Sequence, residues 1–199
     1  MNNFNCGKCL LLVAAAVLIA GCSKQERNEA VQLAKALNAK KANYASADAI
    51  EKDFMGSARA WCDGIVANGA GHGAELDQNA TVASELAKSA VAASTQLSQV
   101  RQAVNDQTLE EDYTRSVRNT LVTELTARQR RLQDVRALLE QISPQFLQYK
   151  RDKTYKGDTY PTEIGNLDAL LQAYRPPEDV VGTALSNLKE KYSLTDSEI

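Results

Sequence analysis

The stretch that decides the fold runs from Leu109 to Ile142, "LEEDYTRSVRNTLVTELTARQRRLQDVRALLEQI". Its apolar residues recur at steps of three or four, which places them on one side of a long helix and favours coiled-coil-like packing. One step is seven residues long and passes over Arg128. Thr108 and Glu111 have the spacing of a capping box, and Ser143-Pro144 is expected to end the helix. The apolar positions are Leu109, Tyr113, Val117, Leu121, Leu125, Leu132, Val135, Leu139 and Ile142.

The preceding stretch carries the same pattern and predicts a second long helix. "NDQ" at 105–107 separates the two, and such a short turn makes the helices antiparallel neighbours. Further upstream we expect two helices over 24–43 and 47–67, joined by a turn at 43–46. They would form a four-helix bundle with the hairpin, or a shorter pair beside it. The stripe of the second long helix is Val82, Leu86, Ala90, Ala93, Leu97, Val100 and Val104.

The last third of the chain predicts shorter elements. Residues 145–161 hold three tyrosines and four basic residues, typical of a frayed helix end and a loop. A short helix follows over 162–174, Pro176-Pro177 stops it, and a last helix has Val181 and Leu185 on its apolar stripe. The sequence therefore predicts an all-α fold: an elongated antiparallel helical bundle with a long coiled-coil-like hairpin and short C-terminal helices. Residues 30–199 would form a single helical domain.

The N-terminus has the pattern of a secretory signal. Residues 10–20 are eleven apolar residues, too few for a membrane span of about 20 but suited to a signal peptide. Ile19-Ala20-Gly21-Cys22 resembles the lipobox of bacterial lipoproteins, and this resemblance covers only the first 22 residues. It implies that residues 1–21 are removed and that Cys22 carries the lipid. Residues 22–29 would then form a polar tether.

The lipobox also implies a location. A chain with acylated Cys22 would be held on a membrane of the bacterial cell envelope, since two or more acyl chains anchor a protein stably. Ser23, in the position after the lipidated cysteine, implies the outer membrane, with the domain facing the periplasm. Membrane contact would therefore be made through the N-terminal lipid.

Little in the chain indicates catalysis. After loss of Cys6 and Cys9 with the signal, Cys62 is the only free thiol, which favours burial, with an intermolecular disulfide as the alternative. His72 is the only histidine, so no metal site is expected. No nucleophile motif or phosphate-binding loop is present. We therefore expect no catalytic residues and no cofactor.

The charge pattern predicts a contact surface. Without Lys8 the mature chain has 22 basic and 25 acidic residues, a net charge of −3 that argues against nucleic-acid binding. Residues 115–156 nevertheless carry ten basic and four acidic residues. This stretch is either a solvated helix face or a docking surface for an acidic partner, anionic lipid or cell-wall polymer. The candidate contact residues are Arg128, Arg130, Arg131, Tyr149, Lys150, Arg151, Lys153, Tyr155, Lys156 and Tyr160.

Two functions are compatible with these features. The first is a non-enzymatic envelope lipoprotein that binds another envelope protein as a scaffold or adaptor. The alternative is a bundle that binds a small apolar ligand or a lipid between its helices, near Phe54 and Trp61. The sequence also leaves open a homo-oligomer, in which a second copy would cover the 109–142 stripe.

Overall fold

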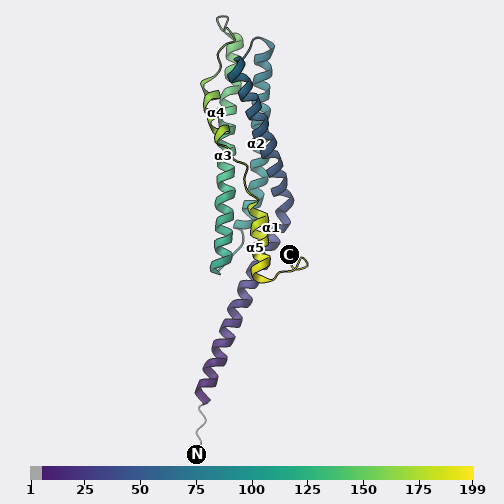
Figure 1. The fold of residues 1–199 in the computed structure, drawn as a ribbon, viewed down its shortest axis with the longest axis vertical. Coiled ribbons are helices and arrows are strands. Elements are labelled where there is room, and N and C mark those ends of the chain that lie inside the picture. Colours follow the sequence, from purple (N-terminus) through teal and green to yellow (C-terminus); the bar gives the residue numbers. More distant parts are fainter. Residues whose placement is uncertain (1–5) are drawn as a thin grey trace, which may run out of the picture.

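A computed structural model describes the backbone of residues 6–199 and the side chains from Lys24 onward. The expected signal peptide therefore lies partly outside the described residues, as does the side chain of Cys22. The described chain is all-α, as predicted, with no strand (Figure 1). Its helices are α1 (Cys6–Asn68), α2 (Ala74–Asn105), α3 (Asp112–Arg151), α4 (Thr162–Ala173) and α5 (Val180–Tyr192).

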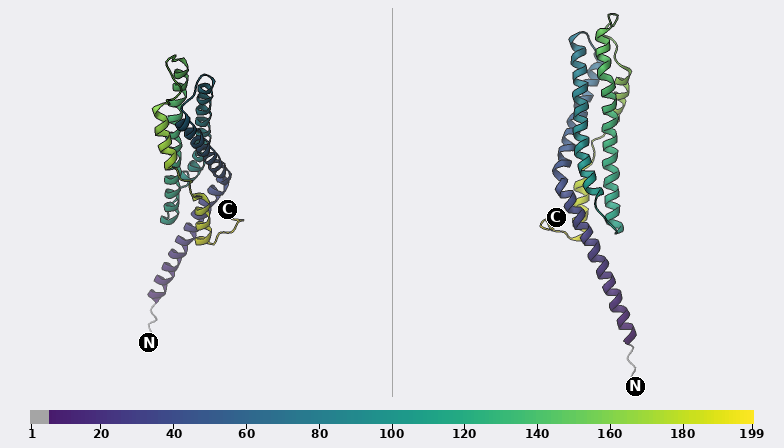
Figure 2. Two further views of the ribbon diagram at one scale, coloured as in Figure 1. Left: turned by 45° about the horizontal axis from the view of Figure 1, so that its top comes forward. Right: turned by 180° about the vertical axis from the view of Figure 1, so that it is seen from behind.

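The helices form a bundle with four positions, and the two short helices α4 and α5 share the fourth. α1, α2 and α3 run up, down and up, and α4 and α5 follow one another down the remaining side (Figures 1 and 2). α2 packs along both α1 and α3, whereas α1 and α3 scarcely meet. α4 and α5 each contact α1 and α3 and so fill the gap between them. The two short helices together take the place of the fourth helix of an up-down-up-down bundle.

The apolar stripes predicted for α2 and α3 face the core. From Leu121 to Ile142 every predicted apolar position is buried, and so are Leu86 to Val104 on α2. Removing each such leucine from water contributes about 1.5–3 kcal/mol. The stripe of α3 is therefore covered within one chain by α2 and by the C-terminal helices.

α1 is one continuous helix, so the predicted turn at 43–46 is wrong. Tyr44 and Ala47 lie on its buried face, 5% and 0% exposed. Asn43 donates to Gln96 and Gln99 of α2, at 2.7 Å in both cases. These hydrogen bonds satisfy the side-chain amide of Asn43 inside the helix, although asparagine by itself favours turns.

The predicted tether at 22–29 is also helical. Glu26 accepts a hydrogen bond of 2.6 Å from the Tyr192 hydroxyl of α5, and Arg27 pairs with Glu198 at 2.6 Å. Glu29 is buried, with 7% of its surface exposed. The folded domain thus begins near Gln25, which donates to Glu110, rather than at residue 30.

α3 begins at Asp112, and the predicted capping box of Thr108 and Glu111 does not form. Glu29 from α1 takes over this role. Its carboxylate accepts the backbone N–H groups of Glu110 and Glu111 at 3.0 and 3.1 Å and the Thr114 hydroxyl at 2.8 Å. Burial favours the neutral acid, but these hydrogen bonds outweigh it and lower the pKa of Glu29.

α3 continues through Pro144 to Arg151, so the predicted end at Ser143-Pro144 is wrong. Pro144 removes one backbone donor, that which would bond the carbonyl of Glu140. The core compensates two residues later, where Phe146 is fully buried and meets Trp61 edge-on at 6.0 Å between centroids. Packing of Phe146 therefore holds the helix beyond the proline.

Cys62 is buried with no exposed surface, which confirms the expectation of burial. Its thiol lies 3.6 Å from the carbonyl oxygen of Ile164 on α4. Burial raises its pKa to about 12, helped by the charges of Asp168 and Asp63. The thiol is therefore neutral and out of reach of a second chain.

No helix within the described part of the chain is both long enough and apolar enough to span a membrane.

Candidate functional site

The basic residues predicted to form one surface lie in separate places. Arg128 is inside the bundle, Arg131 faces Tyr174 at the α4–α5 linker, and Arg130 lines a groove between α2 and α3. The remaining candidates, from Tyr149 to Tyr160, gather at one end of the bundle around the loop after α3 (Figure 1). A continuous patch along the helix does not exist.

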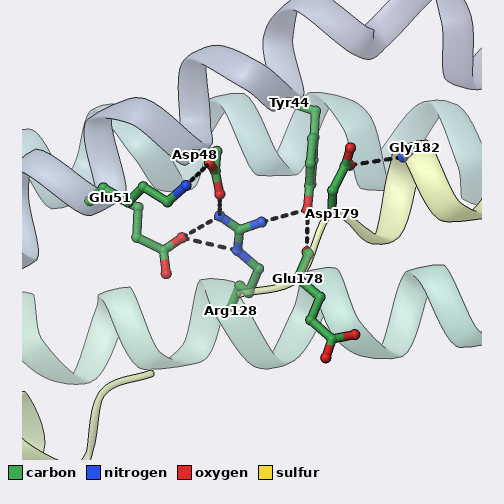
Figure 3. A network of polar contacts seen from close by, with 8 residues as sticks. Tyr44, Asp48, Glu51, Arg128, Glu178, Asp179 and Gly182 are labelled. Atoms are coloured by element: carbon green, nitrogen blue, oxygen red, sulfur yellow. Dashed lines mark hydrogen bonds and ion pairs between the residues drawn. The ribbon is translucent and has the colours of Figure 1, made fainter. Parts of the chain in front are cut away.

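Arg128 cannot belong to a docking surface, because only 2% of it is exposed. Its Nε and Nη2 both donate to Glu51 of α1, at 3.0 and 2.7 Å, and Nη2 also reaches Asp48 at 3.3 Å (Figure 3). Its Nη1 donates to the Tyr44 hydroxyl at 2.9 Å. Three side chains of α1 thus pair with one arginine of α3. This arginine lies within the seven-residue step of the apolar stripe, between Leu125 and Leu132.

The charge on Arg128 is stabilised by its partners. Burial opposes the charge, but the nearby Glu51 carboxylate outweighs it and raises the pKa of Arg128. Glu51 has no exposed surface at all. A buried pair of this kind contributes little net stability while both members are present, yet removing one leaves a buried charge without compensation.

Tyr44, Asp48, Glu51 and Arg128 form a charged layer inside the bundle, and this layer lies at the level of the linker between α4 and α5. The Tyr44 hydroxyl in turn donates a hydrogen bond to the carbonyl oxygen of Glu178, in the linker between α4 and α5, at 3.0 Å (Figure 3). Asp179 then caps α5 by accepting the N–H of Gly182 at 2.8 Å. The charged layer therefore ties α1, α3 and the linker together at one level of the bundle.

Two polar atoms of this layer have no hydrogen-bond partner among the described residues. They are Oε1 of Glu51 and the hydroxyl of Tyr174. Burial, together with the charge of Glu51, raises the pKa of Tyr174 to about 12, so its hydroxyl keeps its proton. The layer thus holds an unused acceptor and an unused donor in addition to its ion pairs.

The second candidate region is the distal tip, which consists of the last turn of α3 (149–151), the loop after it (152–161) and the loop between α1 and α2 (69–73). Tyr149 and Tyr155 stack with centroids 4.6 Å apart, and His72 meets Tyr155 edge-on at 6.0 Å. The backbone N–H groups of Ala70 and Gly71 donate to Thr159 and Gly157, both at 3.3 Å. Two loops far apart in sequence are therefore joined into one surface.

A glycine is required where the two loops meet. Gly157 has a φ of 79°, and a Cβ there would lie 2.2 Å from Nε2 of His72. Any larger residue would be strained and would push the His72 ring away. The tip geometry thus depends on Gly157, which sequence reasoning did not single out.

The charges of the tip are largely exposed. Lys150 pairs with Asp77 of α2, whereas Arg151, Lys153 and Lys156 make no ion pair with the described side chains. Tyr149, Tyr155 and Tyr160 are half-buried. Burial raises the pKa of Tyr149 and Tyr155, so both hydroxyls remain protonated at neutral pH.

Among the side chains that the structure describes, no three from His, Cys, Asp or Glu converge on one point as ligands of a metal would. The region of Phe54 and Trp61 was predicted as an alternative ligand pocket. Phe54 is packed in the core, 2% exposed, whereas Trp61 donates its indole N–H to Asn79 at 3.0 Å and lines a surface cavity of about 380 Å³.

Comparisons with protein-family models, with curated proteins and with solved structures find no match for this chain. Function must therefore be argued from its own residues.

Proposed function

We propose that the protein is a lipoprotein of the bacterial cell envelope that acts as a non-enzymatic adaptor, held on the outer membrane by lipid on Cys22. One observation carries this proposal: the distal tip lies at the end of the bundle opposite the N-terminus (Figures 1 and 2). A lipid at Cys22 and a contact surface at the tip would then occupy opposite ends of one rigid body.

The start of the core fits processing before Cys22. Among the side chains that the structure describes, Gln25 is the first to bond another element, and Ala30 is the first of the apolar core. Cleavage before Cys22 would preserve all of these contacts. The lipidated residue would then stand three positions before the first tertiary hydrogen bond.

The helix after Cys22 would set the reach of the adaptor. At about 1.5 Å per residue, α1 rises about 70 Å between Cys22 and Asn68. No flexible linker separates the lipid from the bundle, because α1 is already helical at Cys22. The tip would be held about 70 Å from the lipid by a stiff body, because α2, α3 and the pair α4 and α5 pack beside α1.

The residues of the tip suit a protein partner. Tyrosine and arginine are enriched in the parts of interfaces that contribute most binding energy, and Tyr149, Tyr155 and Arg151 lie here together. The stacked tyrosines are already held by each other, so they would lose less side-chain entropy when a partner binds them.

Site-specific photocrosslinking in intact envelopes tests this proposal. A photoreactive residue in place of Lys153, at the tip, should form an adduct with one distinct protein, identified by mass spectrometry. The matched control replaces Lys88, an exposed lysine on α2, and should form no such adduct. Equal adducts from both positions, or none from Lys153, would contradict the adaptor role.

Anchoring is tested separately. Mass spectrometry of the mature chain should find acylated Cys22 at the N-terminus, and Cys22→Ala should release the protein from sedimented membranes. A Cys22→Ala chain that still sediments with membranes would show that the lipid is not the anchor.

A further inference from the structure

The interruption of the fourth helix leaves a trough along α3. Pro176 and Pro177 lack backbone N–H donors and cannot continue α4, and the linker bends toward α1, where Glu178 accepts from Tyr44. The trough has a volume of about 590 Å³. Its polar lining consists of Thr120, Glu124, Arg128 and Arg131 from α3 and Arg175 and Glu178 from the linker.

Two guanidinium groups in this trough take part in no described ion pair. Neither Arg131 nor Arg175 lies within ion-pair distance of a carboxylate whose position the structure describes, unlike Arg128 beside them. Both are nevertheless held in place. Arg131 lies over the ring of Tyr174, with Cζ 6.0 Å from the centroid. Arg175 Nη1 donates to the carbonyls of Gln172 and Tyr174 at 3.0 Å, leaving its Nε and Nη2 donors for another group.

The third arginine of the trough is fixed and neutralised. Arg128 has five N–H donors, four of which bond Glu51, Asp48 and Tyr44. One Nη1 hydrogen has no acceptor in the described part of the chain. Arg128 therefore adds little net charge to the trough.

The acidic residues of the lining restrict what can bind. Glu124 and Glu178 stand in the same trough as Arg131 and Arg175, so a polyanion would meet repulsion as well as attraction. A ligand that combines one carboxylate with an adjacent N–H donor would satisfy both kinds of side chain. Arginine binds a carboxylate through two parallel hydrogen bonds, and glutamate accepts from an amine or amide.

We propose that this trough binds an amino-acid carboxylate with its neighbouring nitrogen donor, supplied by a free amino acid or by the C-terminal end of a peptide. Arg131 and Arg175 hold the carboxylate, and Glu124 or Glu178 accepts from the nitrogen. The proposal concerns the middle of the bundle and does not depend on lipid at Cys22 or on the distal tip.

Isothermal titration of the full-length chain in detergent micelles tests the site. The probes are alanine, the dipeptide alanyl-alanine, and the same dipeptide with an amidated C-terminus. Saturable binding of a probe with a carboxylate is expected, together with loss of binding for the amidated dipeptide. Binding of alanine and dipeptide alike identifies a site for free amino acids, whereas binding of the dipeptide alone identifies a peptide end.

Variants locate the site. Arg131→Gln with Arg175→Gln should weaken binding by about tenfold or more, the loss expected for charge-assisted hydrogen bonds. Arg130→Gln is the matched control, because Arg130 is adjacent in sequence but lines the groove on the α2 side. Arg175→Gln alone, at an exposed position, serves if the double variant loses helical content. Absence of heat with every probe, equal binding of the amidated dipeptide, or equal binding by the arginine variants would overturn the proposal.

Discussion

Replacing Arg128 with methionine should be among the most destabilising single changes in this protein. Methionine keeps much of the arginine volume but removes the partner of Glu51, which has no exposed surface. Breaking a buried ion pair by removing one member costs about 3–5 kcal/mol, because the other charge stays buried. A domain of this size has a total stability of about 5–15 kcal/mol, so Arg128→Met should remove a large part of it.

The double variant separates the charge from the packing. In Arg128→Met with Glu51→Leu neither charge remains, and the unbonded Oε1 of Glu51 is also lost. Asp48 keeps its exposed partner Lys52, 2.8 Å away. The double variant should therefore lie within about 2 kcal/mol of the wild type, since apolar replacements of buried ion pairs are often neutral or stabilising.

Urea denaturation followed by circular dichroism and by Trp61 fluorescence measures both effects. The two single variants and the double variant complete a double-mutant cycle, and the double variant should lose far less stability than the two single variants added together. The reasoning is refuted if Arg128→Met costs less than about 1 kcal/mol, within the range of an exposed ion pair. It is also refuted if the loss in the free energy of unfolding of the double variant equals the sum of the losses of the two single variants.

Three further predictions follow from the helix contacts. Cys62 should resist thiol reagents in the folded protein and react completely in urea, because burial raises its pKa to about 12; rapid labelling without denaturant would contradict this. Glu29→Gln should cost about 1–2 kcal/mol at pH 7, as loss of a cap does. Because the folded pKa of Glu29 is lowered, its contribution should be complete above about pH 5 and fall as pH drops through that folded pKa, so acid titrations of wild type and variant should converge. Pro144→Ala should raise stability by about 1–3 kcal/mol by supplying the missing donor to Glu140, and an unchanged or lower midpoint in urea would show that the proline fits the helix without strain.

The sequence was a good guide wherever the helix periodicity was unbroken. The stripes of α2 and α3 are long, and side-chain spacing along a helix depends only on local geometry. The two short helices after Pro161 were also predicted, because prolines and apolar spacing mark both. These signals are local, so they can be recognised in the sequence without knowledge of which other helices pack against each segment.

Sequence reasoning failed where distant side chains decide the local structure. Asn43 favours a turn by itself but is satisfied by Gln96 and Gln99 in the fold. The cap of α3 comes from Glu29, about eighty residues upstream, and nothing near Thr108 reveals it.

The candidate site shows the same limit. Arg128 looks like a surface charge until Glu51 is placed opposite it. The trace of this arginine in the sequence is the seven-residue step over Arg128 in an otherwise regular stripe, whereas its basic neighbours favoured placing it on a contact surface.

The shared fourth position of the bundle also bears on when the chain folds. The backbones of α1 and α3 come close at few places, and α4 and α5 each pack against both of these helices. Leu167, Leu171, Val181 and Leu188 of the two short helices are buried. A nascent chain that ends before residue 162 would expose the apolar sides of two long helices to water. Closure of the core must wait until residues 162–199 have been synthesised, so a shorter nascent chain stays open however completely its three long helices have formed.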